Sequence, residues 1–82
     1  MTDEMLLERI TMDPKVLVGK PVIKGTRLSV ECILNQLAHG ATTEELVGEY
    51  PGLILEDIRA CLLFASRSLD STDFMPLMAE MV

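Results

Sequence analysis

The residues best suited to binding chemistry lie in one short stretch, GKPVIKGTRLSV, at residues 19–30. It holds three of the seven basic side chains, Lys20, Lys24 and Arg27, next to Gly19 and Gly25. Basic side chains and glycine-freed backbone amides contact phosphate oxygens. The net charge of −6 disfavours attraction of nucleic acid to the whole surface, so this segment is the better candidate for phosphate contact. Arg27 has a second reading, in which it braces a hairpin by bonding carbonyls or a carboxylate.

Other arrangements that could support catalysis are incomplete. The sequence GKP resembles part of a phosphate-binding loop, but Pro14 and Pro21 stand where that motif needs Gly and Ser or Thr. His39 is the single histidine, which excludes two-histidine metal sites and suits a solvated position near a helix end. The carboxylates fall in first helical turns and on polar faces, where solvated or capping roles are expected: Glu44, Glu45, Glu49, Glu56 and Asp57. We therefore expect no enzyme, metal or cofactor.

Length and composition define the class of protein. A chain of 82 residues forms one domain with a small core, which a partner or a second copy would stabilise. The acidic N-terminus has no signal-peptide pattern, and no apolar run is long enough to span a membrane. Cys32 and Cys61 form no CxxC pair and are expected to be buried free thiols. We expect a cytoplasmic protein without membrane contact.

The N-terminal part predicts two very short strands. Ile10 and Met12 alternate with polar residues in ERITM, residues 8–12, which is typical of a half-buried strand. Val22 and Ile23 form a second extended piece that Gly25 ends. The sequence leaves open whether the two strands pair within one chain or across a dimer.

Two short helices are predicted next. Apolar residues at helical spacing follow Ser29, whose hydroxyl can cap a helix over residues 30–39, and Gly40 is a suitable stop. Thr42 and Glu45 match a capping box, which predicts a second helix that ends near Tyr50.

A third helix is predicted over residues 56–69. One stripe is expected to form its core side: Ile58, Cys61, Leu62, Ala65 and Leu69. The run ACLLFA, residues 60–65, is apolar on every side, so it needs cover on every side. Three short helices and a hairpin provide little cover, so we expect Leu63 or Phe64 to face another chain.

The C-terminal tail, residues 71–82, is separate from the helical domain with N-terminal strands, residues 1–70. Its apolar residues Phe74, Leu77, Met78 and Met81 are spaced as on a helix face, but so short a helix is unstable alone. Folding onto its own core, docking to a partner and exchange within a dimer all remain open for this tail.

Three stretches carry a resemblance to a known family. They are DPKVLVGKPVIKGTRLSV, ILNQLAHGATTEELVGEYPGL and EDIRACLLFA, and the resemblance that rests on them runs from about Ile10 to Ala65. In this order they resemble domain of unknown function 433, a family of small prokaryotic proteins regarded as antitoxin components. The resemblance implies a three-helix bundle of homeodomain-like or helix-turn-helix type, preceded by a short β-hairpin or pair of strands. Leu55 departs from the family pattern, which usually has Thr or Ser at the cap of the third helix.

The resemblance also implies partners. Family members are thought to neutralise a ribonuclease-like toxin with a PIN-type fold and to bind their own promoter. We expect a non-enzymatic antitoxin-like homodimer that binds such a toxin through Leu63, Phe64 and the apolar residues of the tail. The alternative is a dimeric helix-turn-helix regulator that binds promoter DNA through Lys20, Lys24, Arg27 and Arg59. A third reading is a dimer whose only partner is itself.

Overall fold

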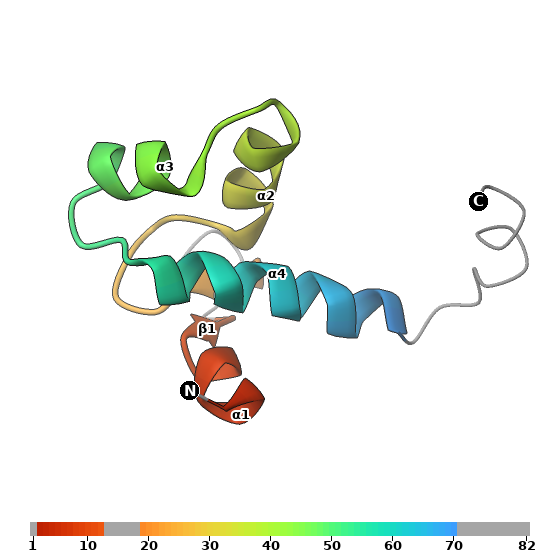
Figure 1. The fold of residues 1–82 in the computed structure, drawn as a ribbon. Coiled ribbons are helices and arrows are strands. Elements are labelled where there is room, and N and C mark those ends of the chain that lie inside the picture. The colour runs from red at the N-terminus through yellow and green to blue at the C-terminus, as the bar shows by residue number, and fades with distance from the viewer. Residues whose placement is uncertain (1, 13–18, 71–82) are drawn as a thin grey trace, which may run out of the picture.

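The computed structural model describes residues 2–12 and 19–70. These residues are mainly helical, with four helices and one two-stranded antiparallel sheet. The elements are α1 (Asp3–Leu7), β1 (Ile10–Thr11), β2 (Val22–Ile23), α2 (Val30–Ala38), α3 (Thr43–Glu49) and α4 (Leu55–Asp70). Helix α4 crosses the molecule, with α1 on one side and α2 and α3 on the other (Figure 1).

Helix α1 was not predicted from the sequence. The Thr2 hydroxyl accepts a hydrogen bond from the Met5 amide at 3.2 Å, and Asp3 and Glu4 occupy the first turn. Both features stabilise a helix N-terminus. Only five residues are helical, too few to show a periodic pattern, so contact with α4 accounts for much of its stability.

The two predicted strands pair within the chain, which answers the question that the sequence left open. Ile10 lies opposite Ile23 and Thr11 opposite Val22. Val22 and Ile23 are both buried, because this short sheet packs against the helices instead of facing water.

The basic stretch after β2 forms a tight turn. Gly25 has a φ of +81°, which a side chain would disfavour, and Val22 forms an isolated bridge with Ser29. The Thr26 hydroxyl donates to the Ile23 carbonyl at 2.8 Å and accepts from the Leu28 amide at 3.0 Å. Thr26 therefore stabilises this turn by a side-chain hydrogen bond to a carbonyl oxygen, the role that one reading of the sequence gave to Arg27. The Arg27 guanidinium makes no hydrogen bond or ion pair within the described residues.

Helices α2 and α3 confirm the sequence prediction. Ser29 caps α2 by accepting from the Cys32 amide at 2.9 Å, and Gly40 follows the helix with a φ of +97°. Thr42 and Glu45 form the complete capping box of α3, with bonds of 2.8 and 3.1 Å. These features depend on residues close in sequence, and so the local pattern was sufficient to find them.

The start of α4 differs from the prediction. Leu55 is the first helical residue, so Ile54 holds the position before the helix. The Ile54 amide donates to Oδ2 of Asp57 at 3.1 Å, which is the half of a capping box that the third helical residue supplies, while Ile54 has no side-chain oxygen for the reciprocal bond. Asp57 thus has the capping role expected of it, but it is buried and not solvated.

The core lies where the sheet, α2, α3 and the first half of α4 meet. Its fully buried side chains include Ile23, Ile33, Leu46, Ile58 and Cys61. Two residues of the predicted α4 stripe do not belong to it, because Leu62 and Leu69 are exposed. Helical periodicity located the stripe, but the neighbouring elements cover only the side centred on Ile58 and Cys61. The tail, residues 71–82, lies outside the described residues.

Candidate protein-binding surface

Helix α4 carries a row of exposed leucines, Leu55, Leu62 and Leu69, which we call the leucine row. Their exposed fractions are 40, 49 and 59%, rising toward the end of the helix. Residues seven apart lie two turns apart on the same side of a helix, about 10 Å along its axis. A regular apolar row of this kind is the side that a helix presents to another helix or to an apolar groove.

A second apolar feature, the α2–α4 groove, lies between α2 and the last turns of α4. It has a volume of about 560 Å³, within the range of binding cavities. The lining residues are mostly apolar: Pro21, Val30, Leu34, Phe64, Ala65 and Leu69, with Glu31, Asn35 and Ser68. Leu69 thus belongs to the groove and to the leucine row, so the two features join at the end of α4.

Polar groups of the groove bond close by. Glu31 Oε1 lies 3.2 Å from Lys20 Nζ in an exposed ion pair, and the Ser68 hydroxyl donates to the Phe64 carbonyl at 3.0 Å. The Ser68 hydroxyl thus has a partner within α4, and Lys20 partly neutralises the charge of Glu31, whereas Asn35 is an exposed polar residue of the groove.

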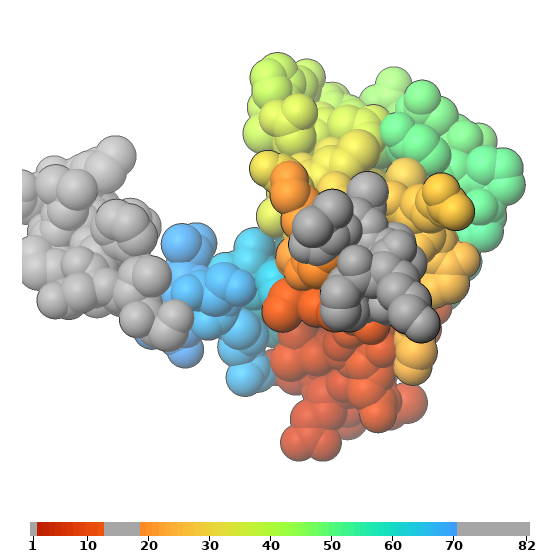
Figure 2. All heavy atoms as spheres, turned by 180° about the vertical axis from the view of Figure 1, so that it is seen from behind, coloured from red at the N-terminus to blue at the C-terminus, as the bar shows by residue number. Residues whose placement is uncertain are grey.

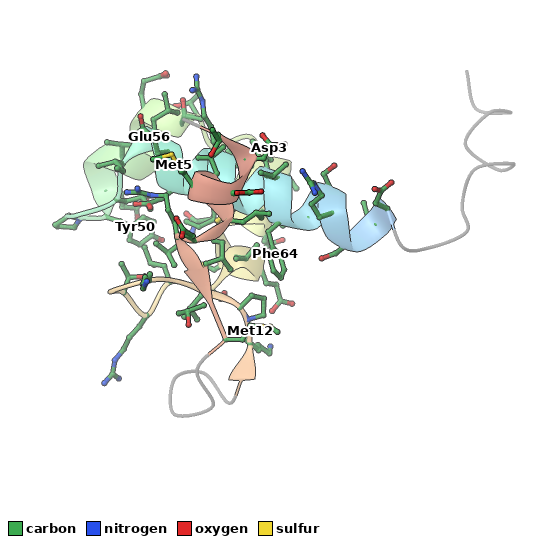
Figure 3. All side chains as sticks on the ribbon, turned by 90° about the horizontal axis from the view of Figure 1, so that it is seen from below. Asp3, Met5, Met12, Tyr50, Glu56 and Phe64 are labelled. Atoms are coloured by element: carbon green, nitrogen blue, oxygen red, sulfur yellow. The ribbon has the colours of Figure 1, made fainter. Side chains whose placement is uncertain are left out.

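Phe64, a predicted partner-binding residue, lies at the base of this surface. It is half-buried, packs against the core and lines the α2–α4 groove. It also extends toward the end of β1, where it shares a second cavity of about 330 Å³ with Leu7 and Met12 (Figure 3). Leu63 is half-buried as well. The exposed leucine of this turn is Leu62, which the sequence analysis placed in the core.

The first turn of α4 is held by a partly buried ion pair that the sequence did not predict. Arg9 Nε lies 2.7 Å from Asp57 Oδ1, and the Asp57 side chain is only 6% exposed. Its other oxygen accepts from the Ile54 amide. Both oxygens of the carboxylate are thus bonded, which offsets the cost of burying its charge. The pair joins the N-terminal segment to α4 and positions the leucine row.

The two cysteines are free thiols, as predicted. Cys61 is fully buried, and burial first, then the negative charge of Asp57, raises the pKa of its thiol from 9.0 to about 12. A thiol that keeps its proton is unreactive. Cys32 is half-buried, and its sulfur accepts from Gln36 Nε2 at 3.3 Å, while the same amide donates to the Tyr50 hydroxyl at 2.9 Å.

The four basic residues proposed for nucleic-acid contact are exposed but differ in their surroundings. Lys20 is paired with Glu31. Lys24 lines a cavity of about 400 Å³ that also contains Arg9, Glu8 and Asp57, so two acids reduce its positive potential. The cavity that Lys24 lines includes none of the other three, which are Lys20, Arg27 and Arg59. His39 is exposed at the end of α2, as predicted, with Nδ1 2.7 Å from the Asn35 carbonyl oxygen.

The residues proposed for the tail part of the surface lie outside the described residues: Phe74, Leu77, Met78 and Met81.

Within residues 2–12 and 19–70, no three side chains of His, Cys, Asp or Glu are grouped as metal ligands. In the same residues, no helix has both the length and the apolar content needed to cross a bilayer.

Fold and surface together define a small, mainly helical domain with an N-terminal hairpin and an exposed apolar side. Residues 10–65 match the model of the family described as "Protein of unknown function (DUF433)". This match covers more than half of the chain, and the chain therefore belongs to that family, as its resemblance indicated.

Three individual relatives were found. An uncharacterised protein, y4eO, of Sinorhizobium fredii is 34% identical over 58 residues, which are 71% of this chain and 26% of that protein. An uncharacterised protein of Archaeoglobus fulgidus is 64% identical over 25 residues, covering 30% of this chain and 69% of the relative. The crystal structure of a DUF433 member from Anabaena variabilis matches with a TM-score of 0.73 and 31% identity. That match covers 82% of this chain and 66% of the crystallised one.

The chain thus spans about a quarter of the length of y4eO and just under two thirds of the Anabaena protein. The shared part is the domain described above. None of the three descriptions states an activity, a ligand or a partner.

Proposed function

We propose that this protein is a non-enzymatic, antitoxin-like module that binds a protein partner through the leucine row of α4. The observation that supports this proposal most strongly is the exposure of Leu55, Leu62 and Leu69 on one side of a single helix. Full burial of an exposed leucine contributes about 1.5–3 kcal/mol, and these leucines, which are about half exposed, would each gain roughly half of that in an interface. Exposed apolar side chains that gather on one side of a small domain are typical of a protein interface.

The proposed partner is a ribonuclease-like toxin of PIN-type fold, which the family resemblance implies. The chain carries a net charge of −6, which complements the basic surface that an RNA-cleaving enzyme presents to its substrate. Electrostatic attraction speeds the encounter, whereas the leucine row provides the contact that holds the complex. Antitoxin action follows if the complex covers the toxin's RNA-binding side.

The experiment is to identify the protein encoded by the adjacent gene and, if it has a PIN-type fold, to titrate it with this protein by calorimetry. Leu62→Lys places a charge at the centre of the leucine row and should weaken binding about 30-fold or more, the loss typical of a central interface residue. Val47→Lys is the matched control, because Val47 is an exposed apolar residue of α3, outside the leucine row, and the added charge is identical.

The control should bind within about threefold of the unmodified protein, since peripheral contacts contribute little. Equal losses in the two variants would assign the effect to charge alone and would contradict a leucine-based interface. Tight binding that neither variant changes would place the toxin elsewhere on the protein.

The alternative function is that of a dimeric helix-turn-helix regulator that binds promoter DNA. Lys24 and Arg27 belong to the exposed turn after β2, and Arg59 is exposed on α4. If this reading holds, a promoter fragment should be retarded with a steep salt dependence, and Lys24→Glu should abolish the shift. No retardation at low salt would eliminate it. In either reading the homodimer remains a proposal, which sedimentation equilibrium of the purified chain tests directly.

A further inference from the structure

The α2–α4 groove lies at the end of α4, where the C-terminal tail begins. Ser68 and Leu69 line this groove, and α4 ends at Asp70. Twelve more residues follow in the sequence, starting at Ser71. We infer that the apolar residues of this tail, Phe74, Leu77, Met78 and Met81, occupy the α2–α4 groove of their own chain. This inference goes beyond the proposed function and does not depend on it.

The chemistry of the tail fits the groove. The four apolar residues lie at positions i, i+3, i+4 and i+7, which places them on one side of a helix. Asp73 is a suitable N-terminal cap, and Pro76 would fall in the first turn, where a helix tolerates proline. The groove offers a matching apolar lining that includes Leu34, Phe64 and Ala65.

The connection has a suitable length. Between Asp70 and Phe74 lie Ser71, Thr72 and Asp73, three polar residues typical of turns. Antiparallel helices are commonly joined by two to five residues, so this segment is long enough to reverse the chain. A helix over residues 74–82 would be about 13 Å long. That length is similar to the stretch of α4 from Phe64 to the end of the helix.

Attachment to α4 favours the tail over other occupants. A segment joined by a short linker has an effective concentration in the millimolar range, above that of any separate chain at ordinary protein concentrations. An isolated helix of this length is unstable in water, but the apolar lining would stabilise it on docking. The docked tail would cover Leu69 and leave Leu55 and Leu62 exposed. The proposed partner would then contact the middle and the start of the leucine row.

Tryptophan fluorescence tests this inference well, because the natural chain contains no tryptophan. Phe74→Trp places a single reporter on the apolar side of the tail, and Met75→Trp places it on the other side. With the full chain at micromolar concentration, the reporter at position 74 should emit at shorter wavelength and resist acrylamide quenching. The reporter at position 75 should behave as a solvated indole. Met78→Trp and Ala79→Trp form a second pair, in case the larger ring at position 74 prevents docking.

A change in the groove provides the reciprocal test. Leu69→Glu puts a carboxylate into the lining at an exposed position of α4, so the domain should still fold. In this background the reporter at position 74 should become solvated. The tail should also be cut faster by protease, by about 5- to 30-fold, which is the ratio expected for a weakly stable docked state.

Three outcomes would overturn the inference. If both members of each reporter pair are solvated at every protein concentration, the tail does not occupy the groove. Protection that rises with concentration, together with a dimer mass in sedimentation, would place the tail in the groove of a second copy. Protection that persists unchanged in Leu69→Glu would place it on another part of the domain.

Discussion

The two halves of α4 have similar apolar content but different surroundings. In the first half, Asp57, Ile58, Ala60 and Cys61 are buried, and Arg9 and Ile54 bond to the Asp57 carboxylate. In the second half, residues 62–70, no residue is buried, and the helix projects from the rest of the molecule (Figure 2). Leucine is as apolar as isoleucine, so the difference comes from the number of elements close enough to cover each half. Stability is therefore expected to reside mainly in the first half, whereas most of the exposed contact surface, at Leu62 and Leu69, belongs to the second.

The largest expected effect is on the core side of the first half. Ile58→Ala should lower the free energy of unfolding by about 2–5 kcal/mol, because it removes a fully buried side chain and leaves a cavity. Leu62→Ala, the same type of truncation one turn later, should change it by less than about 0.5 kcal/mol. Urea unfolding followed by circular dichroism measures both. Similar losses in the two variants would show that the halves do not differ.

The second prediction concerns the ion pair that holds the first half. Asp57→Ala should destabilise the domain by about 3 kcal/mol, because Arg9 loses its buried partner and the Ile54 amide loses its acceptor. Asp3→Ala removes the exposed pair in which Asp3 Oδ2 lies 3.0 Å from Arg67 Nη2 in the second half. That change should cost less than about 1 kcal/mol. Thermal unfolding of both variants in one buffer measures the two losses. A larger loss in Asp3→Ala than in Asp57→Ala would show that the second half is the more strongly held one.

The third prediction uses pH. The pKa of the Cys61 thiol is raised to about 12 in the folded protein, mainly by burial, against 9.0 in an exposed thiol. Between these values the unfolded chain has lost the thiol proton while the folded chain keeps it. The stabilisation is therefore complete below pH 9 and is lost as the pH rises toward 12.

Cys61→Ala should consequently show a smaller fall in the urea midpoint above about pH 9 than the unmodified protein. Comparing the two proteins removes the contribution of other groups that titrate in this range. Parallel curves would mean that Cys61 is not protected from solvent and that the first half opens readily.

The smallest effect is expected from changes that alter only the exposed side of the second half. Leu62→Lys and Ser66→Lys should each leave the free energy of unfolding within about 0.5 kcal/mol of the unmodified protein. Differential scanning calorimetry checks this point. If Leu62→Lys proved strongly destabilising, Leu62 would belong to the core after all, and a loss of partner binding in that variant would have a different cause.

The features that the sequence predicted correctly depend on neighbouring residues. Ser29 and Gly40 bound α2, and the pair Thr42 and Glu45 starts α3, because caps act within three or four positions of the chain. The strands Ile10–Thr11 and Val22–Ile23 were found from their short alternating or apolar patterns. The family match over residues 10–65 agrees with the stretch inferred from the motifs.

The features that were missed depend on packing between distant parts of the chain. Periodicity placed Leu62 and Leu69 beside Ile58, but it contains no information on which flank of a helix a neighbour covers. Arg9 and Asp57 are 48 positions apart, and no local pattern connects them. One signal was available for Asp57: an acid at the third position of a helix is placed to accept from the backbone amide of the residue before the helix.

The distance in sequence between Arg9 and Asp57 has a consequence for how the domain folds. Their bond closes a loop that contains the hairpin, α2 and α3, and closing a longer loop costs more chain entropy. Helices α2 and α3 carry their caps nearby and are able to form early, whereas α4 acquires its last N-terminal restraint only when β1 arrives. Native contacts of high sequence separation slow folding. Loss of Arg9 should therefore accelerate unfolding more than it slows refolding, the kinetic pattern of a contact made after the rate-limiting step.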